Sequence, residues 1–449
     1  MSSESSLLTA LFSAFDAANI RYAVMRNYQS LPTSAGGSDV DILIQGGQAR
    51  MVQRLLKEVV IASSAVLLGI AESDKFFKAC VLGPCSPTRC RYWGVCLDFN
   101  LGLSFKGCDL LADDAALPIH SHNGVWVLED GFGAIVGLLK EALNNAHLDF
   151  RYLPRAQRLT DCDWSAVSKL LAPLGPAATR QLVSLTRPEI RSEDARTECI
   201  ALRRDLMRNA MKKGWFRFAC RRFANEWAKL RRYVSPSGLV IAILGVDGAG
   251  KSTVINSMLP ALNAATHNSV VVQHLRPTVL PPLARLLRGK KSVDEVQMPP
   301  HGASPSGFVG SLVRAAYLTL DYILGYWVWT RVKIARYPTV VIFDRYAYDL
   351  AIDPHRFRIR LGASVTRWFV ALVPKPDIVF CLHGNPDIIA SRKNELSVAE
   401  TRRQLDALED FVRREPNAVL VSCDKDPEST VAHVMAETLS YLQKREKGR

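Results

Sequence analysis

The sequence predicts an α+β domain, then a helical linker, then an α/β domain whose doubly wound parallel sheet carries helices on both faces. In the first half, short strand patterns mix with helical ones, and helical patterns dominate from about 128 to 232. After 239, five apolar runs alternate with helical patterns, as parallel strands do when helices connect them. Between the halves, "VSPSG" has the composition of a linker. We therefore expect domains at 1–155, 156–235 and 236–449.

The composition of the 449-residue chain is that of a globular protein, with 48% hydrophobic and 22% charged residues. The N-terminal stretch lacks a basic segment and a small-residue cleavage site, so we expect a capped amphipathic helix and not a signal peptide. Cys80, Cys85, Cys90 and Cys96 lie close together but lack the CxxC spacing of zinc sites. Free thiols and a reducing, cytoplasmic location are therefore favoured.

The first domain begins with a strand–loop–strand pattern at 21–44, which ends in "GSDVDILI". Helical spacing follows at 46–60. Two apolar stretches around a Gly/Pro/Ser loop at 80–101 predict a β-hairpin.

Three acids in this domain are candidate metal ligands. Side chains alternate along a strand, so Asp39 and Asp41 point to one face while Val40 and Ile42 point to the core. Asp98 leaves the apolar face of a later strand in the same way. Three carboxylates so placed can bind divalent metals for phosphoryl or nucleotidyl transfer. The alternative is that Asp39 caps a turn and that the other two are ordinary strand-face acids.

This arrangement resembles the nucleotidyltransferase fold of the DNA polymerase β type over about residues 5–150. In that family a Gly-Ser loop, an Asp-x-Asp strand and a third Asp bind a magnesium-bound nucleoside triphosphate. Here Gly37-Ser38 directly precedes the acids, and Met25–Tyr28 occupies the usual place of the loop. Either Arg26 and Asn27 contact phosphate instead, or triphosphate binding is impaired. The resemblance leaves a catalytic domain and a binding module open.

A phosphate-binding loop is predicted at the start of the last domain. Residues 245–252 fit GxxxxGK[ST], follow a predicted strand and open a helical pattern. Glycines let the backbone wrap around phosphates, and N–H groups at the helix N-terminus point at the negative charge. We expect Lys251 to reach the β- and γ-phosphates of ATP and Ser252 to bind Mg²⁺. The predicted ATP-binding residues are Gly245, Asp247, Gly248, Ala249, Gly250, Lys251, Ser252 and Thr253.

An acid and an arginine follow the apolar run at 340–343, at the carboxyl end of a strand, where such sheets bind ligands. In this position Asp344 can hold Mg²⁺ or accept a proton from the phosphoryl acceptor, and Arg345 can clamp a phosphate. Both are predicted catalytic residues, together with Lys251.

A basic segment at 391–404 follows the fourth apolar run and has a helix–turn–helix pattern. Arg392, Arg402 and Arg403 are its predicted catalytic cations, and Lys393 accompanies them. Such a flap can close on a transferring phosphoryl group and stabilise its charge. An exposed basic helix face is the alternative.

Together, the "GVDGAGKST" loop, the Asp-Arg-Tyr after the middle strand and the Arg-rich flap resemble thymidylate kinase and its relatives over roughly 237–445. The resemblance implies an α/β P-loop kinase fold and phosphoryl transfer from magnesium-bound ATP. It also implies that Asp247 touches the sugar of the acceptor nucleotide, while Asp344 and Arg345 handle the acceptor phosphate and the metal. The expected acceptor-binding residues are Asp247, Arg276, Arg345 and Tyr346.

The chain departs from this family on the acceptor side. "His274-Leu-Arg276-Pro277" replaces a Glu-Pro-Gly-Gly type segment, and a long Pro-rich insertion follows it. Residues 347–360 are highly charged where a base pocket is expected. The acceptor is therefore open between dTMP, another nucleotide, and a sugar with or without phosphate.

Two segments bear on partners. Residues 201–232 carry eleven Lys/Arg and two acids, interleaved with aromatic residues. This pattern fits peripheral contact with an anionic membrane or nucleic acid, but we favour an interdomain helix whose aromatic face docks on a neighbour. Residues 312–330 are nearly as apolar as a membrane span, yet charged residues interrupt them. We expect a buried or interfacial helix there and no transmembrane span.

The sequence thus predicts a cytoplasmic, ATP- and magnesium-dependent phosphotransferase acting nominally on dTMP. One alternative is a bifunctional kinase and nucleotidyltransferase acting on a sugar or sugar phosphate in bacterial surface-polysaccharide synthesis. Another is a nucleic-acid end-processing protein that uses the formal net charge of +14, although nucleic acid is the less favoured partner. The oligomeric state is open, a homodimer included.

Overall fold

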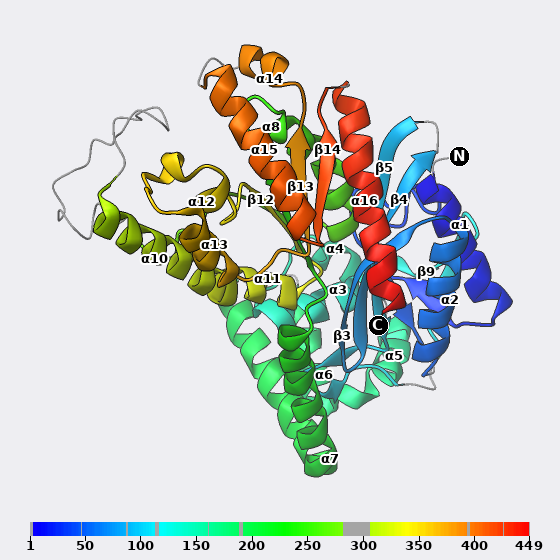
Figure 1. Cartoon of the computed structure of the whole chain (residues 1–449). Helices are drawn as coiled ribbons and strands as arrows, with labels where there is room; N and C mark the ends of the chain where they lie inside the picture. Colours follow the sequence, from blue (N-terminus) through cyan, green and yellow to red (C-terminus); the bar gives the residue numbers. More distant parts are fainter. Residues whose placement is uncertain are drawn as a thin grey trace. The chain divides into compact units, whose positions relative to one another are not determined.

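The computed structural model describes residues 3–45, 47–86, 89–112, 116–159, 161–187, 192–281, 306–392, 396–424 and 426–448. The chain divides into two compact units. Unit 1 comprises 1–83 and 95–232, and unit 2 comprises 84–94 and 233–449. The division at 232–233 lies next to the predicted linker composition. Figure 1 shows the elements of both units in the colours of the sequence.

Unit 1 is built on a mixed sheet with the strand order β3-β4-β5-β2-β1-β9-β8. The short strands β6 and β7 pair separately. The bounds are β1 Tyr22–Val24, β2 Val40–Ile44, β3 Val66–Ser73, β4 Phe76–Ser86, β5 Arg89–Leu101, β6 Ser104–Phe105, β7 Cys108–Asp109, β8 Ile119–His122 and β9 Val125–Leu128. β2 and β5 run parallel, and their register places Asp41 opposite Asp98. The predicted strand–loop–strand and hairpin are confirmed, whereas β3, β8 and β9 were not predicted.

The helices of unit 1 include several, from α3 to α7, that share one core with its sheet. Their bounds are α1 Ser3–Ala17, α2 Ala49–Ala62, α3 Asp130–Asn145, α4 Leu153–Ala156, α5 Asp161–Leu170, η1 Ala172–Leu174, α6 Pro176–Leu185 and α7 Ser192–Val234. The core cluster joins Leu43 of β2 and Leu139 of α3 to Leu182 of α6 and Leu202 of α7. The helical extension predicted at 156–235 therefore packs with the first domain over most of its length.

Unit 2 is a parallel sheet with the order β11-β12-β10-β13-β14. The strands are β10 Leu239–Leu244, β11 Val270–His274, β12 Val340–Asp344, β13 Ile378–His383 and β14 Ala418–Ser422. All six residues of β10 are buried, as expected for a parallel strand covered on both faces. Figure 1 shows β13 and β14 between α15 and α16. The predicted doubly wound parallel sheet is confirmed, and all five predicted strands are present.

Helices connect these strands. Their bounds are α8 Lys251–Thr266, α10 Phe308–Gly325, η2 Tyr326–Thr330, α11 Arg331–Arg336, α12 Asp349–Ile352, η3 Pro354–Phe357, α13 Ala363–Ala371, α14 Pro386–Arg392, α15 Val398–Arg414 and α16 Pro427–Lys447. α8 packs against α16, and α12 packs against α15. Most of the Pro-rich insertion, at 282–305, lies outside the described residues.

The apolar segment predicted at 312–330 forms most of α10 and all of η2, and α11 continues the helix to Arg336. Among the described residues this helix, Phe308–Arg336, is the one long and apolar enough to cross a membrane, and 33% of its most apolar window is buried. A core helix of a soluble protein meets the same length and composition test. The expected burial is met only in part, and the absence of a transmembrane span stays a prediction.

Candidate active site

The phosphate-binding loop connects the central strand of unit 2 to its first helix. Gly248 and Gly250 have φ values of 90° and 89°, which side chains with a Cβ rarely adopt. A Cβ on Gly248 would lie 2.8 Å from the Ile389 carbonyl oxygen, whereas a Cβ on Gly250 would meet nothing within 4 Å. The loop therefore packs tightly on α14 at one glycine and faces open space at the other, as a phosphate cradle requires.

Lys251 begins α8 and is 8% exposed. Its Nζ donates hydrogen bonds to the carbonyl oxygens of Gly245 (2.9 Å) and Val246 (3.0 Å). Burial, together with the nearby charge of Arg345, lowers the Lys251 pKa to about 8. The ammonium thus folds back onto its own loop. Ser252 and Thr253, the next two residues, are exposed.

Asp344 ends β12, which pairs directly with β10. Its Oδ2 lies 3.1 Å from Nδ1 of His274, and its Oδ1 is buried with no hydrogen-bond partner in the described part of the chain. A buried carboxylate oxygen without a donor is costly unless a cation binds it. With the exposed Ser252 hydroxyl, Asp344 supplies the hard oxygen ligands that Mg²⁺ prefers, so the residues present fit a magnesium-bound nucleotide.

A network of opposite charges surrounds the loop acid. The Asp247 carboxylate accepts hydrogen bonds from Arg345 and from Arg356. Arg345 also pairs with Asp349 (3.1 Å), and Arg356 pairs with Asp353 (3.3 Å). Burial opposes ionisation of Asp247, but the charges of Arg345, Lys251 and Arg356 outweigh it and lower its pKa. Both predicted residues, Asp247 and Arg345, therefore lie in one ionised cluster.

Arg345 also has an unusual backbone. Its φ of 74° lies in the left-handed region, and its side chain is 3% exposed. Non-glycine residues adopt this conformation at a cost, which the surroundings must offset. Here the offset comes from the ion pairs to Asp247 and Asp349. Arg345 is therefore held in place before any ligand binds.

The three predicted arginines of the flap lie on two helices, α14 and α15. Arg392 ends α14, and its Cβ would lie 3.7 Å from a Cβ on Gly248, so this helix end adjoins the phosphate loop. Arg403 on α15 is ion-paired with Glu400 (2.7 Å) and donates to the Ile352 carbonyl oxygen (3.2 Å). Arg402 is exposed, and Lys393 lies outside the described residues. A closing flap stays a prediction.

Two residues expected to bind the acceptor have structural partners. Tyr346 is 1% exposed, and its hydroxyl donates to the Pro374 carbonyl oxygen at 2.6 Å. The expectation for Tyr346 is therefore wrong: the left-handed turn at Arg345 directs the next side chain into the core, where it packs on Phe343. Arg276 pairs with the buried Asp321 of α10 at 3.1 Å, which fixes its guanidinium.

Unit 1 brings Asp39, Asp41 and Asp98 together at the ends of β2 and β5, as predicted. Protein cations lie against all three carboxylates. Lys78 Nζ is 2.9 Å from Asp98 and 3.8 Å from Asp39. Arg26 pairs with Asp41, and Lys140 lies 3.2 Å from Asp41.

These ion pairs set the protonation of the acids. Burial opposes ionisation of Asp41, but Lys140 and Arg26 outweigh it and lower its pKa. Burial raises the pKa of Asp98 to about 6, although Lys78 acts in the opposite direction. Among the described residues, no group of three or more His, Cys, Asp or Glu side chains is placed to hold a metal ion. Metal binding at these acids stays a prediction.

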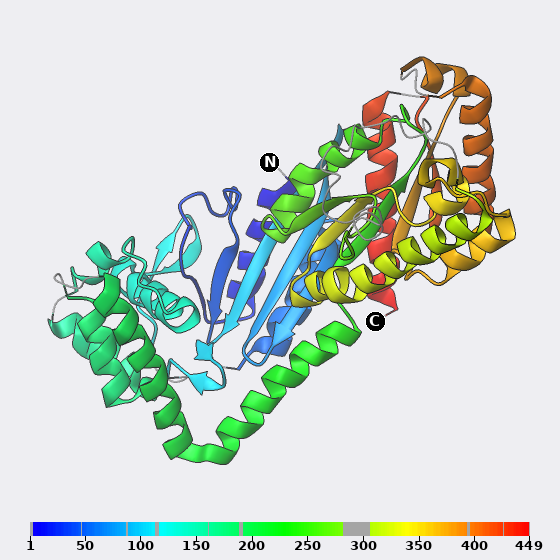
Figure 2. The ribbon, with the colours of Figure 1, turned by 90° about the vertical axis from the view of Figure 1, so that its left-hand side faces the viewer.

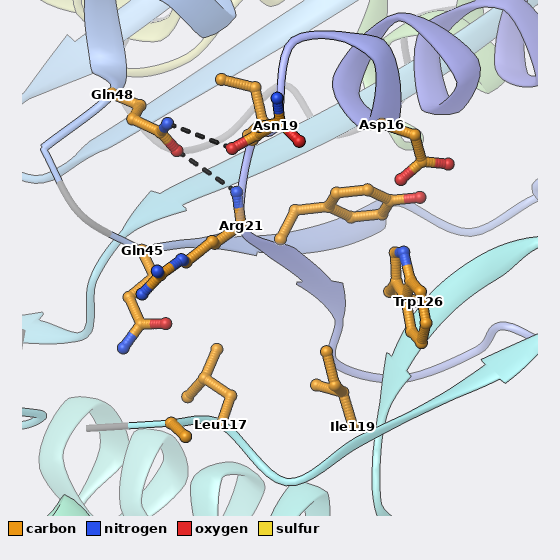
Figure 3. Close-up of a pocket in the computed structure, with 11 residues that line it drawn as sticks. Asp16, Asn19, Arg21, Gln45, Gln48, Leu117, Ile119 and Trp126 are labelled. Carbon is orange, nitrogen blue, oxygen red and sulfur yellow. Dashed lines mark hydrogen bonds between the residues drawn. The ribbon is translucent and has the colours of Figure 1, made fainter. Parts of the chain in front are cut away.

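Two of the hollows that described residues form lie in unit 1. A cavity of about 70 Å³ lies beside Asp41 and is lined partly by Arg26, Lys140 and Tyr152. An open groove of about 1160 Å³ is lined by other residues, among them Asp16, Gln48 and Trp126 (Figure 3). There the Gln48 side chain accepts from the backbone N–H of Arg21 (3.2 Å) and donates to the Asn19 carbonyl oxygen (3.4 Å). The three predicted acids do not line that groove.

Sequence reasoning missed several members of both clusters. Lys78 and Lys140 received no role, although a lysine inside the apolar strand pattern "FFKACVL" is a signal of a buried ion pair. Arg356 was noted only as part of a charged stretch. His274 was noted only as a departure from a family pattern. Their partners lie far away in the sequence, so local pattern carried no information on the pairing.

No protein-family model matches the sequence, and no curated protein matches it. Solved structures do resemble part of the chain. A thymidylate kinase from Ehrlichia chaffeensis is 17% identical, covers 45% of this chain and 100% of its own, and has a TM-score of 0.30. A thymidylate kinase from Candida albicans is 16% identical, covers 45% of this chain and 91% of its own, and has a TM-score of 0.34. Both similarities are distant.

Proposed function

We propose that unit 2 transfers the γ-phosphoryl group of magnesium-bound ATP to a small acceptor, nominally a nucleoside monophosphate such as dTMP. One observation carries the proposal. The glycine loop has open space at Gly250 and lies next to the buried Lys251. Asp344, the last residue of the adjacent strand, has a carboxylate oxygen with no hydrogen-bond partner among the described residues. Enzymes that bind nucleoside triphosphates combine a glycine-rich loop, a loop lysine and an acid that holds Mg²⁺.

The donor side follows from the loop. Backbone N–H groups at the start of α8 would bind phosphate oxygens. The Lys251 ammonium would give up its hydrogen bonds to the carbonyl oxygens of Gly245 and Val246 and donate to a phosphate oxygen instead. An ammonium is a compact charge with rotatable donors, so it can change acceptors in this way. Ser252 and Asp344 would hold Mg²⁺, which when bound neutralises charge on the phosphate oxygens.

The acceptor side follows from the arginine cluster. Arg345 and Arg356 fix Asp247 at the edge of the loop, where its carboxylate can accept a hydrogen bond from an acceptor hydroxyl. Both guanidinium groups can also bind a phosphate in bidentate fashion. A phosphorylated acceptor with free hydroxyl groups therefore fits this cluster. Arg392, whose Cβ adjoins the loop, would stabilise charge on the transferring group.

Phosphorus NMR of the full chain with ATP, Mg²⁺ and a panel of acceptors tests the proposal. The panel contains dTMP, other nucleoside monophosphates, and sugars with and without phosphate. ADP and a phosphorylated acceptor should form with the wild type and be lost in Lys251→Ala. ADP formation that persists in Lys251→Ala, or no phosphorylated product with any acceptor, would overturn it.

A bifunctional enzyme of surface-polysaccharide synthesis is the second candidate, because the register of β2 and β5 places Asp41 opposite Asp98 with Asp39 nearby. In that case unit 1 would transfer a nucleotidyl group to a sugar or sugar phosphate. The same spectra would then show pyrophosphate, lost in Asp41→Ala and retained in Lys251→Ala. Nucleic-acid end processing would instead require binding to DNA or RNA that weakens steeply with salt.

A further inference from the structure

We infer that α7 after Gly214 is a docking surface for an anionic lipid bilayer. The helix changes direction at Gly214, whose φ of 170° and ψ of 86° are not helical, and Figure 2 shows the bend. The second arm runs from 215 to Val234. Its aromatic residues were expected to dock on a neighbouring element. Phe218 does pack against the core of unit 1, whereas Trp215 and Phe216 are 69% and 68% exposed.

One face of this arm is an unbroken apolar stripe. Its members Phe216, Phe223, Trp227, Leu230 and Val234 are separated by seven, four, three and four residues, so a helix places them on one side. Their exposed fractions are 68%, 69%, 57%, 53% and 68%. The rings of Phe223 and Trp227 stack on each other with centroids 6.2 Å apart, so they form one continuous apolar surface.

The other side of the arm is fixed to unit 1. Arg221 pairs with Asp74 (2.7 Å) and Asp109 (2.8 Å). Asn225 accepts a hydrogen bond from the backbone N–H of Asp74 at 3.3 Å. These contacts leave the apolar stripe facing outward, and they hold it there without any ligand.

The second arm of α7 is positively charged, which favours an anionic partner. Residues 215–234 contain six Lys/Arg and a single acid. The side chains of Arg217, Lys229 and Arg231 are 80%, 61% and 65% exposed. Basic residues beside exposed Trp and Phe are the pattern of interfacial helices, which insert rings at the headgroup level and attract anionic lipids.

Two other occupants fit this face less well. A second copy of α7 packed along the stripe would bring the Arg217 and Arg231 side chains of both copies near one seam, where like charges repel. Nucleic acid would satisfy the basic residues, but it offers no apolar phase for Leu230 and Val234. A bilayer surface satisfies both the charge and the apolar stripe.

Co-sedimentation of the full chain with lipid vesicles tests the inference. We expect binding to phosphatidylcholine vesicles that contain phosphatidylserine, and little binding to phosphatidylcholine alone or at high salt. The double variant Phe223→Ser with Trp227→Ser should lower the partition coefficient at least about tenfold, because two large side chains leave the interface. Its thermal unfolding should match the wild type, since both positions are exposed.

The matched control changes exposed apolar residues of α10, Val309→Ser with Val313→Ser, which are 71% and 51% exposed in the wild type. It should keep wild-type binding. Equal binding by the α7 double variant, loss of binding in the α10 variant alone, or no sedimentation at low salt would overturn the inference. So would a lipid-free dimer, measured by light scattering, that the α7 double variant dissociates.

Discussion

The two units each hold a cluster of aspartates beside arginine and lysine, but the clusters are completed differently. In unit 1, Arg26, Lys78 and Lys140 lie against all three acids. In unit 2, Asp247 and Asp349 are paired, while one oxygen of Asp344 is buried and has no donor among the described residues. The first cluster is neutralised by the protein itself, and in the second we propose that a cation binds this oxygen. Carboxylates on adjacent strands therefore do not by themselves indicate a metal site.

The largest expected effect is on the stability of unit 1. Lys78→Met would leave Asp98 buried without its cation, whereas Asp39 keeps Arg26 at 3.7 Å, and we expect a loss of about 3–5 kcal/mol of unfolding free energy. Urea denaturation of the full chain, followed by a probe in unit 1, measures it. The control Lys229→Met breaks an exposed pair and should cost less than about 1 kcal/mol. If the two variants behave alike, Lys78 does not neutralise the cluster.

The next effect concerns the loop lysine of unit 2. Lys251→Ala should lower kcat/KM for ADP formation at least about 100-fold, because one preorganised cation aimed at the transferring group is lost. Steady-state kinetics with the productive acceptor measures the change. Lys375→Ala, which removes an exposed lysine of the same unit, should leave the rate unaltered. A similar loss in both variants would indicate damage to the fold.

Measuring Mn²⁺ affinity distinguishes the aspartate cluster of unit 2 from that of unit 1 more directly. With a non-hydrolysable ATP analogue, Mn²⁺ should bind at least about tenfold more weakly to Asp344→Asn, because a hard oxygen ligand is removed. Asp98→Asn should bind Mn²⁺ like the wild type. Electron paramagnetic resonance of free Mn²⁺ gives both affinities. Weaker binding in Asp98→Asn would show that unit 1 holds a metal after all.

The smallest expected effect is on phosphoryl transfer after a change in unit 1. Asp41→Asn should alter kcat/KM for ADP formation by less than about twofold, because Asp41 and its ion-pair partners Arg26 and Lys140 all belong to unit 1. The same kinetic assay measures it, with Lys251→Ala as the reference for full loss. A large decrease would mean that unit 1 takes part in the reaction of unit 2.

Much of this architecture could be predicted from sequence because its signals are local. The apolar run before Gly245 and the spacing of the loop specify β10, the turn and α8 in one continuous stretch. The alternation around Asp41 likewise indicated β2 and the face of its acids. Both depend on neighbours within about one helical turn or one strand, where periodicity is informative.

The remaining features depend on partners far apart in the chain. Arg356 reaches Asp247 across 109 positions, and Lys140 reaches Asp41 across 99. Tyr346 follows two residues of the site yet turns into the core, because the backbone at Arg345 is left-handed. The sequence pattern does not predict that Tyr346 is buried, because arginine seldom adopts the left-handed conformation found at Arg345.

The central position of β10 has a consequence for dynamics. Strands pair with it on both edges, and none of its six residues reaches solvent, so its amide hydrogens should exchange only when unit 2 opens as a whole. The glycine loop therefore begins at the strand whose amide hydrogens should exchange most slowly, and it ends at α8, whose first residue is the buried Lys251. Its N–H donors therefore keep their directions, and the nucleotide that we propose as ligand would bind with little loss of loop entropy.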